Sequence, residues 1–250
     1  MKKFIGYFDY LGFKDFILNN DLEYQNRIMN NIFRDIESAL GNGKFKEAII
    51  GVIADLSDSK INCINFSDTV VFWTNDDSLD SLRELLEVTF QFNYQAIKYF
   101  FPVRGSIVFG DIVHADFRQK NEVGGFYNLN SIYGNGLVNA HIKTEYQDWA
   151  GSVIDQTVIN VLLAREINPE EFLNQYAKKY NIPYKPGYEV DFEEFALCLG
   201  KGYLNDEAFK NISTDIERNF ADHKKSIDNP GVRIKLDNTI KFLKSFIKIE

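Results

Sequence analysis

The amino-acid sequence predicts an α+β fold, in which a mainly antiparallel sheet is covered by helices on one face. Strand-like segments occur in pairs separated by short polar turns, and hairpins of this kind join antiparallel neighbours. Long amphipathic segments with helical periodicity alternate with these pairs. This order differs from the regular alternation of strand and helix that a doubly wound parallel sheet requires.

The first element is a buried strand over residues 3–9, where apolar and β-prone residues predominate. Gly12 permits a tight turn into a helix that is predicted over residues 13–41. Apolar residues recur in this segment with a partial helical period: Phe16, Ile17, Ile28, Ile32, Ile36 and Leu40. The sequence Gly41-Asn42-Gly43 ends the helix.

Strand segments are predicted next over residues 46–54 and 60–74, with a polar loop between them. Asp68 falls within the second segment, at or near a hairpin turn. The residues Asn75-Asp76-Asp77-Ser78 then cap a long amphipathic helix over residues 79–101.

Pro102 opens a further strand over residues 103–113. The residues that follow, 115–132, are polar and contain glycine, so they are predicted to form a loop that covers a site.

Three short elements complete a predicted core domain of residues 1–165: a helix over 137–147, a strand over 151–155 and a helix over 156–165. The remaining residues, 166–250, are charged and are predicted to form a mostly helical extension packed on the core. Its helices are expected over 168–180, 206–224 and 233–248, with a break at 184–188.

Composition limits the functional class. The formal net charge of -8 argues against a dedicated nucleic-acid partner or an anionic membrane surface. Cys63 and Cys198 fit no metal motif, and two cysteines without a framework suit a reducing compartment. No signal peptide and no apolar run long enough to span a membrane is visible, so a cytoplasmic location is expected.

Two aspartates stand out because each lies among apolar, β-prone residues. Asp9 ends the first strand, and Asp68 directly precedes the run Thr69–Trp73. A carboxylate in such a place is costly to bury unless it is paired or binds a metal. Two of them on neighbouring strands would form a site for hard divalent cations, as two-metal nucleotidyl transfer requires.

Four motifs resemble those of class III nucleotidyl cyclases, in the same order along the chain. They are Phe-Asp-Tyr-Leu-Gly-Phe (8–13), Phe-Ser-Asp (66–68), Val-Arg-Gly-Ser-Ile-Val-Phe-Gly (103–110) and Tyr-Gly-Asn-Gly-Leu-Val-Asn-Ala (133–140). Within that family, the motifs are most similar to the pyrimidine nucleotide cyclases of the Pycsar anti-phage system. The resemblance covers roughly residues 3–160 and implies a ferredoxin-like βαββαβ core.

The resemblance also implies an activity, a cofactor and an assembly. The reaction would convert a nucleoside triphosphate to its 3′,5′-cyclic monophosphate and pyrophosphate. Two divalent cations, Mg²⁺ or Mn²⁺, would be bound by Asp9 and Asp68, with the Tyr10 carbonyl as a further ligand. The enzyme would be a homodimer with two active sites at its interface. Phosphate oxygens would be received by backbone N–H groups of three residues at a helix N-terminus: Leu11, Gly12 and Phe13.

The base is predicted from two departures from the purine cyclases. Those enzymes read adenine with a Lys four residues before the second metal-binding Asp and an Asp two residues before the aromatic-Gly-Asn element. The matching positions here are Ile64 and Ser131, and Ile64 also lacks the Glu of guanylate cyclases. A pyrimidine is therefore expected, uracil rather than cytosine, with Asn130, Ser131 and Tyr133 as candidate contacts.

The transition-state residues depend on the alignment register. In one register they are Asn139 and Lys143, one helical turn apart and facing the same way. In the other they become Val138 and Ile142, and both polar groups disappear. Arg104 is either a triphosphate or interface contact or a structural ion pair.

The leading hypothesis is an enzyme that makes cyclic UMP, or cyclic CMP, as a second messenger for a separate effector with a cyclic-nucleotide-binding domain. Two alternatives remain at this point. One is a purine (adenylate or guanylate) cyclase, and the other is a cyclase-like domain that binds nucleotide without turnover.

Overall fold

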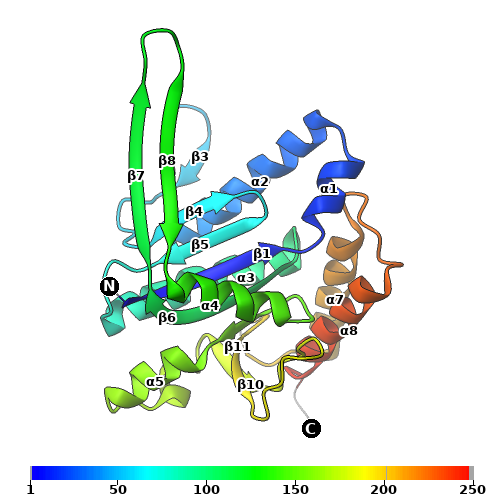
Figure 1. Cartoon of the computed structure of the whole chain (residues 1–250). Helices are drawn as coiled ribbons and strands as arrows, with labels where there is room; N and C mark the ends of the chain where they lie inside the picture. The colour runs from blue at the N-terminus through cyan, green and yellow to red at the C-terminus, as the bar shows by residue number, and fades with distance from the viewer. Residues whose placement is uncertain (1, 201, 248–250) are drawn as a thin grey trace.

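A computed structural model describes residues 2–200 and 202–247 of the chain. Its centre is a seven-stranded sheet made of β1 (Lys2–Tyr10), β4 (Asn62–Phe66), β5 (Thr69–Trp73), β6 (Val103–Asp111), β9 (Ser152–Ile154), β10 (Ala177–Tyr180) and β11 (Glu194–Leu197). The strand order is β10-β11-β9-β6-β1-β5-β4 (Figure 1).

Four of these strands, in the order β6-β1-β5-β4, form the antiparallel sheet of a ferredoxin-like βαββαβ unit. Within the sheet only β6 and β9 pair in parallel. The register across β1 sets the candidate site, because Asp9 lies opposite Thr69 of β5 and opposite Arg104 of β6. The predicted mainly antiparallel α+β fold is confirmed.

Eight helices surround the sheet in the described residues: α1 (Phe13–Asn19), α2 (Leu22–Leu40), α3 (Leu79–Tyr99), α4 (Asn135–Tyr146), α5 (Gln156–Ala164), α6 (Pro169–Leu173), α7 (Asp206–Ala221) and α8 (Pro230–Lys244). Helices α2 and α3 cover one face, as predicted. Helix α4 packs against the opposite face, on β6 and β1. No helix in the part of the chain that the structure describes is long and apolar enough to cross a membrane.

The two faces alternate along β1, as the pleat of a strand requires. Phe4 and Phe8 belong to the main core beneath α2 and α3, whereas Ile5 and Tyr7 belong to a smaller apolar cluster beneath α4. Asp9 continues the second series. Helix α4 can lie directly on this face because Gly136 has no side chain. A Cβ at this position would come within 2.9 Å of the Gly110 backbone.

The helix predicted over residues 13–41 is interrupted, and the cause is local hydrogen bonding. The Asn20 side chain donates to the Phe16 carbonyl, and the Asp21 side chain caps α2 by accepting from the Tyr24 N–H. Asn and Asp side chains that bond to nearby backbone groups favour helix ends over helix interiors. The chain therefore bends between α1 and α2.

The strand predicted over residues 46–54 is a small separate hairpin of β2 (Phe45–Glu47) and β3 (Val52–Ala54). The segment 60–74 forms the hairpin β4–β5, as predicted, and Phe66 pairs with Thr69 across a two-residue turn of Ser67 and Asp68.

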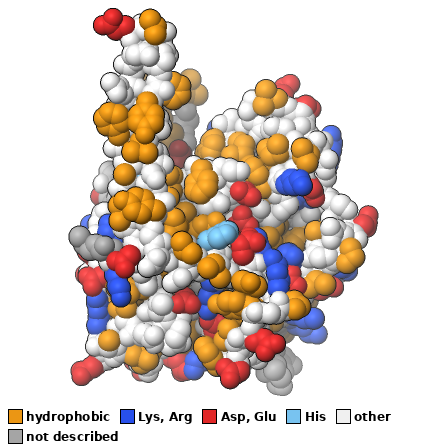
Figure 2. Space-filling view, in the orientation of Figure 1, with side chains coloured by type: hydrophobic (Ala, Val, Ile, Leu, Met, Phe, Trp, Pro, Cys, Tyr) orange, Lys and Arg blue, Asp and Glu red, His pale blue; other side chains and the backbone are white. Residues whose placement is uncertain are grey.

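The loop predicted over residues 115–132 is wrong. The chain there forms two paired strands, β7 (Val113–Lys120) and β8 (Phe126–Tyr133), which project from the body as a long arm (Figure 1). Its side chains are mostly exposed, and apolar ones gather along it (Figure 2). Without a buried face, the arm lacks the apolar–polar alternation by which a strand is recognised in sequence.

The extension also differs from its prediction. The helix expected over 168–180 is replaced by the short helix α6 and the strand β10, and residues 194–197 form β11. Both strands join the central sheet beyond β9. Helices α7 and α8 agree in position with the predicted 206–224 and 233–248, although residue 248 lies outside the described residues. Helix α7 packs against α3 and α8.

Candidate active site

Asp9 lies at the end of β1, on the sheet face that α4 partly covers. Its side chain is 15% exposed. Tyr7, two residues earlier, points to the same face, and its hydroxyl forms hydrogen bonds with Thr69 Oγ1 (3.4 Å) and His141 Nδ1 (3.1 Å). Strand β1, strand β5 and helix α4 therefore all contribute side chains around Asp9.

Asp68 lies in the tight turn between β4 and β5. The preceding residue, Ser67, has a left-handed backbone with φ of 53°, which is uncommon for a residue with a side chain. The Tyr10 N–H donates to the Asp68 carbonyl at 2.9 Å. This bond ties the end of β1 to the hairpin turn, so the structure brings the Asp9 and Asp68 segments together as predicted.

Arg104 connects Asp9 to α4. Its Nε and Nη2 both donate to Asp9 Oδ2, at 3.1 and 2.8 Å. The same guanidinium donates to the Glu145 carbonyl at 3.0 Å and forms an ion pair with the Glu145 carboxylate. Of the two roles that the sequence left open for Arg104, the ion pair is the one present in this structure.

The electrostatics of Asp9 reflect these neighbours. Burial raises the pKa of the Asp9 carboxyl, and Arg104 offsets part of this effect. The negative charges of Asp68 and Glu145 raise the pKa of Asp9 further. Repulsion between Asp9 and Asp68 is what a cation bound between them would relieve.

The residues present fit a pair of hard divalent cations. Asp9 and Asp68 would supply carboxylate oxygens to such cations, and the Tyr10 backbone carbonyl lies in the same segment of chain. No group of three or more His, Cys, Asp or Glu side chains in residues 2–200 and 202–247 is arranged to hold a metal ion. Two carboxylates completed by water and phosphate oxygens suit Mg²⁺, which seldom occupies an all-protein cage.

The turn between β1 and α1 supports the phosphate-binding prediction only in part. Gly12 has φ of 80° and precedes the first residue of α1, Phe13. The Leu11 N–H, however, donates to the Pro102 carbonyl at 2.8 Å and so has an internal partner. The prediction that Leu11 offers its N–H to a phosphate is therefore not met in this conformation.

The side chain of Lys143 is engaged in contacts within the protein. It is buried, and its ammonium lies 2.5 Å from Glu194 Oε1 and 2.9 Å from Asp155 Oδ2. Burial lowers the pKa of Lys143, but the two carboxylates raise it above its ordinary value. Asn139, by contrast, is exposed. Lys143 therefore occupies a buried ion-pair cluster, and none of the hydrogen bonds or ion pairs of the described residues links it to Asn139.

The predicted base contacts lie on the arm. Asn130, Ser131 and Tyr133 belong to β8, and Asn130 Oδ1 is 2.8 Å from His114 Nε2 of β7. None of the hydrogen bonds or ion pairs of the described residues links these three side chains to Asp9 or Asp68. Their role in base recognition stays a prediction.

Three residues at the site were missed from the sequence: Tyr7, His141 and Glu145. Tyr7 could have been found, because a residue two positions before Asp9 in a strand shares its face. His141 and Glu145 are four residues apart and lie on one side of α4. Their proximity to Asp9 could not be foreseen, because no pattern indicated that α4 covers this face.

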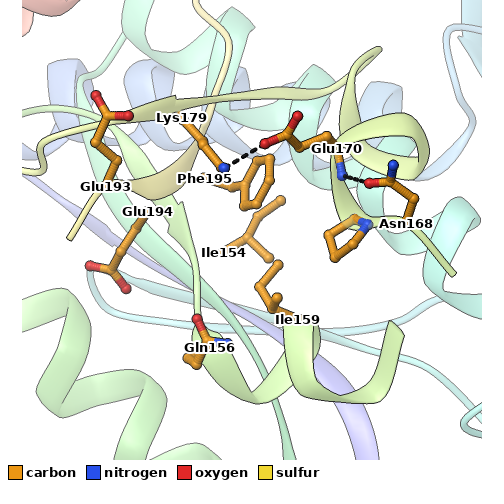
Figure 3. A pocket seen from close by; sticks show the side chains of 10 residues that line it. Ile154, Gln156, Ile159, Asn168, Glu170, Lys179, Glu193, Glu194 and Phe195 are labelled. Carbon is orange, nitrogen blue, oxygen red and sulfur yellow. Dashed lines mark hydrogen bonds and ion pairs between the residues drawn. The ribbon is translucent and has the colours of Figure 1, made fainter. Parts of the chain in front are cut away.

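The pocket in Figure 3 lies elsewhere, between β9, α5, α6, β10 and β11. It has a volume of about 390 Å³, with Ile154, Ile159 and Phe195 among its apolar lining residues. Lys179 and Glu170 form an ion pair at its rim. Asp9, Asp68 and Arg104 do not line it, so it is separate from the candidate active site.

Comparison of the chain with protein-family models gives no match, and comparison with curated proteins gives none either. Solved structures do match. The catalytic core of a rhodopsin-guanylyl cyclase with converted specificity, in complex with ATPαS, superposes with a TM-score of 0.52 at 8% identity, covering 78% of this chain and 94% of that one.

Two further structures give the same result. The guanylate cyclase domain of RhGC from Catenaria anguillulae, in complex with GTP, has a TM-score of 0.51 at 8% identity, covering 78% and 93% of the two chains. The non-canonical dimeric guanylyl cyclase domain of the RhoGC fusion protein from the aquatic fungus Blastocladiella emersonii has a TM-score of 0.50 at 10% identity, covering 80% and 94%. The chain has the fold of a class III cyclase catalytic domain.

Proposed function

We propose that the protein is a nucleotidyl cyclase, which converts a nucleoside triphosphate to its 3′,5′-cyclic monophosphate and pyrophosphate. One observation carries this proposal. In a sheet of cyclase topology, Asp9 is the penultimate residue of β1 and Asp68 occupies the adjoining β4–β5 turn, and the two segments are joined by a backbone hydrogen bond. Two carboxylates at neighbouring strand ends are the minimum protein contribution to a two-metal site.

The chain's own residues would act as follows. Asp9 and Asp68 would hold two divalent cations, Mg²⁺ or Mn²⁺, together with the Tyr10 carbonyl. When bound, such cations lower the pKa of the ribose 3′-hydroxyl and neutralise the triphosphate and the leaving pyrophosphate. Arg104 holds the Asp9 carboxylate in one orientation through two hydrogen bonds. Gly12 lets the backbone approach the phosphates closely.

We further propose a pyrimidine substrate, UTP in preference to CTP. The argument rests on Ser131 and on Ile64, a partly buried β4 residue that packs against the smaller apolar cluster. Neither side chain carries the charge with which purine cyclases read their base. The matched rhodopsin-guanylyl cyclase structures contain ATPαS and GTP, both purine nucleotides.

A homodimer with active sites at its interface is the assembly that suits this arrangement. One of the matched cyclase domains is dimeric. The predicted base contacts Asn130, Ser131 and Tyr133 lie on the projecting arm. In a homodimer, these side chains would contact a nucleotide bound by the second protomer more readily than one bound by their own. The product would act as a second messenger in anti-phage defence, on a separate effector with a cyclic-nucleotide-binding domain.

The decisive experiment is incubation of the purified protein with ATP, GTP, CTP and UTP separately, with Mn²⁺ or Mg²⁺, and identification of products by mass spectrometry. Cyclic UMP from UTP alone is the expected result. Cyclic CMP from CTP would support the proposal of a pyrimidine substrate, but the preferred base would then be cytosine and not uracil. Cyclic AMP or cyclic GMP would keep the site and overturn the reasoning from Ile64 and Ser131.

Isosteric variants test the metal-binding carboxylates. Asp9→Asn and Asp68→Asn each remove a negative charge while retaining the side-chain shape, and each should abolish product formation in a folded protein. A folded variant with full activity would contradict the assignment. If the wild-type protein is folded, takes up Mn²⁺ and forms no product from any nucleotide, the non-catalytic nucleotide-binding alternative replaces the cyclase proposal.

A further inference from the structure

The segment Asp222–Lys225, which follows α7, is fastened to the junction between α1 and α2. The side chain of Asn20 donates to the His223 carbonyl at 2.8 Å, and the side chain of Asn19 donates to the Lys224 carbonyl at 3.0 Å. His223 Nδ1 lies 3.0 Å from the Tyr24 hydroxyl. The C-terminal extension therefore contacts the first helix after the candidate active site.

The backbone of this segment is unusual. His223 and Lys224 both have left-handed conformations, with φ of 64° and 56°. Two consecutive residues with side chains rarely adopt this region, and they persist only where the surroundings impose it. The His223 ring is half-buried and stacked on Phe101 at a centroid distance of 5.3 Å, which supplies part of that constraint.

Lys225 extends from this segment beneath Gly12. A Cβ placed on Gly12 would lie 2.8 Å from Lys225 Cδ and 3.3 Å from Lys225 Cγ, so the lysine stem is in contact with the turn. Its ammonium donates to the Asn219 carbonyl of α7 at 2.7 Å and lies 4.0 Å from the centre of the Phe101 ring. Among the described residues, no carboxylate forms an ion pair with this buried cation.

Lys225 connects α7 to the turn at Gly12. The stem of Lys225 supports the turn, and its ammonium anchors the stem to α7 and Phe101. The turn in question begins directly after Asp9 and Tyr10, the residues proposed to bind the cations. Because Gly12 follows Tyr10 by two residues and Asp9 by three, a displacement of Gly12 would also shift these two residues of the candidate site.

We propose that Lys225 is a positioning residue, through which the C-terminal extension holds the Leu11–Phe13 turn in the geometry that nucleotide binding requires. This inference rests on the proposed cyclase function. It assigns to the extension a direct part in the active site, in addition to its part in the fold. The support is steric, so the aliphatic stem is its essential component.

Two substitutions separate the stem from the charge. Lys225→Ala removes both, and should raise KM for the nucleotide that the wild type turns over at least tenfold. Lys225→Met keeps an unbranched stem of similar length, and should keep KM within threefold of the wild type. Leu243→Ala is the matched control, because Leu243 is fully buried in α8 of the same extension. This substitution should destabilise the extension without raising KM.

Amide hydrogen exchange provides a readout that does not depend on turnover. Exchange at residues 11–16 should accelerate in Lys225→Ala, and should stay at the wild-type rate in Lys225→Met and in Leu243→Ala. A general loss of stability would instead accelerate exchange throughout the sheet, in Lys225→Ala and in Leu243→Ala alike. These measurements remain informative even if the wild-type protein forms no cyclic nucleotide.

The outcomes decide between the two proposals. An inactive wild type would refute the cyclase proposal, while exchange would still report on the support. An active Lys225→Ala variant with unchanged KM and unchanged exchange would overturn the inference. Equal increases in KM for the Ala and Met variants would also overturn it, because they would place the effect in the charge and not in the stem.

Discussion

Arg104 donates two hydrogen bonds to Asp9, and both end on the same carboxylate oxygen, Oδ2. The side chains are 9% and 15% exposed, so the pair is shielded from water. Asp9 is thus held in a single orientation by a guanidinium whose other face is bound to Glu145. Oxygen Oδ1 takes no part in this pair.

Substitution of Arg104 should reveal how far Asp9 depends on a positive neighbour. Arg104→Met leaves a mostly buried carboxylate without its counter-charge, and we expect a loss of about 3–5 kcal/mol in the free energy of unfolding. Because a divalent cation can supply the missing charge, Mn²⁺ should raise the melting temperature of this variant by more than it raises that of the wild type. Differential scanning calorimetry with and without Mn²⁺ measures both effects, and an equal response of the two proteins to Mn²⁺ would argue against cation binding at Asp9.

Lys143 should prove structural. Lys143→Met removes the ammonium that lies between the buried carboxylate of Glu194 and the partly buried carboxylate of Asp155, and we expect destabilisation of about 3–5 kcal/mol. The turnover number of the folded fraction should stay within a few-fold of the wild-type value. Urea unfolding combined with kinetics below the transition tests this. A variant of wild-type stability that has lost turnover would instead restore the catalytic role predicted for Lys143.

The buried ammonium of Lys225 should make stability depend on pH. Burial lowers the pKa of Lys225 to about 7 in the folded protein, against 10.5 as its ordinary value. Asp222 opposes this shift, and His223 is the neighbouring titratable group. Between these two pKa values the unfolded chain binds more protons than the folded one, so this lysine makes stability rise with pH across that window, by at most about 1.4 kcal/mol per pH unit.

The comparison with Lys225→Met isolates that contribution. The difference in unfolding free energy, variant minus wild type, should fall as pH increases from 7 to 10 and should be constant below pH 6. Urea unfolding at a series of pH values provides the measurement. A difference that stays the same from pH 6 to pH 10 would show that Lys225 titrates at its ordinary value.

The projecting arm should be dispensable for folding. Its side chains from residue 116 to residue 130 are exposed, so replacing residues 115–131 by a short glycine-containing turn removes little buried surface. The shortened protein should keep the wild-type far-ultraviolet circular dichroism of its helices and melt within a few degrees of the wild type. A molten or aggregated product would show that the arm supports the sheet. The mass in solution would show whether the arm also holds two protomers together.

Local patterns in the sequence predict much of the sheet and draw attention to the two aspartates proposed to bind cations. The strand over residues 3–9, the turn at Asp68 and the helix over 79–101 follow from apolar periodicity and from caps, which act locally, and the structure agrees with each. The break at Asn20 is also local, and its Asn-Asp sequence could have indicated it. Asp9 and Asp68 were recognised because carboxylates among β-prone residues are unusual.

Other features depend on contacts between distant parts of the chain. Lys143 looked like a surface partner of Asn139, because no local pattern reveals that Asp155 and Glu194 converge on it. The arm reads as a loop because exposed strands need no apolar alternation. Lys225 is separated from Gly12 by more than two hundred residues, and the contact arises only when α7 packs against α3.

The position of β11 between β9 and β10 has a practical consequence for dividing this protein. Residues 1–165 contain every element of the ferredoxin-like unit, yet a fragment that stopped there would leave one side of β9 with unpaired backbone groups. An uncovered strand of this kind is a template for association with other chains. The ferredoxin-like unit and the extension therefore share one hydrogen-bonded sheet, and fusion or domain-exchange experiments should move them together.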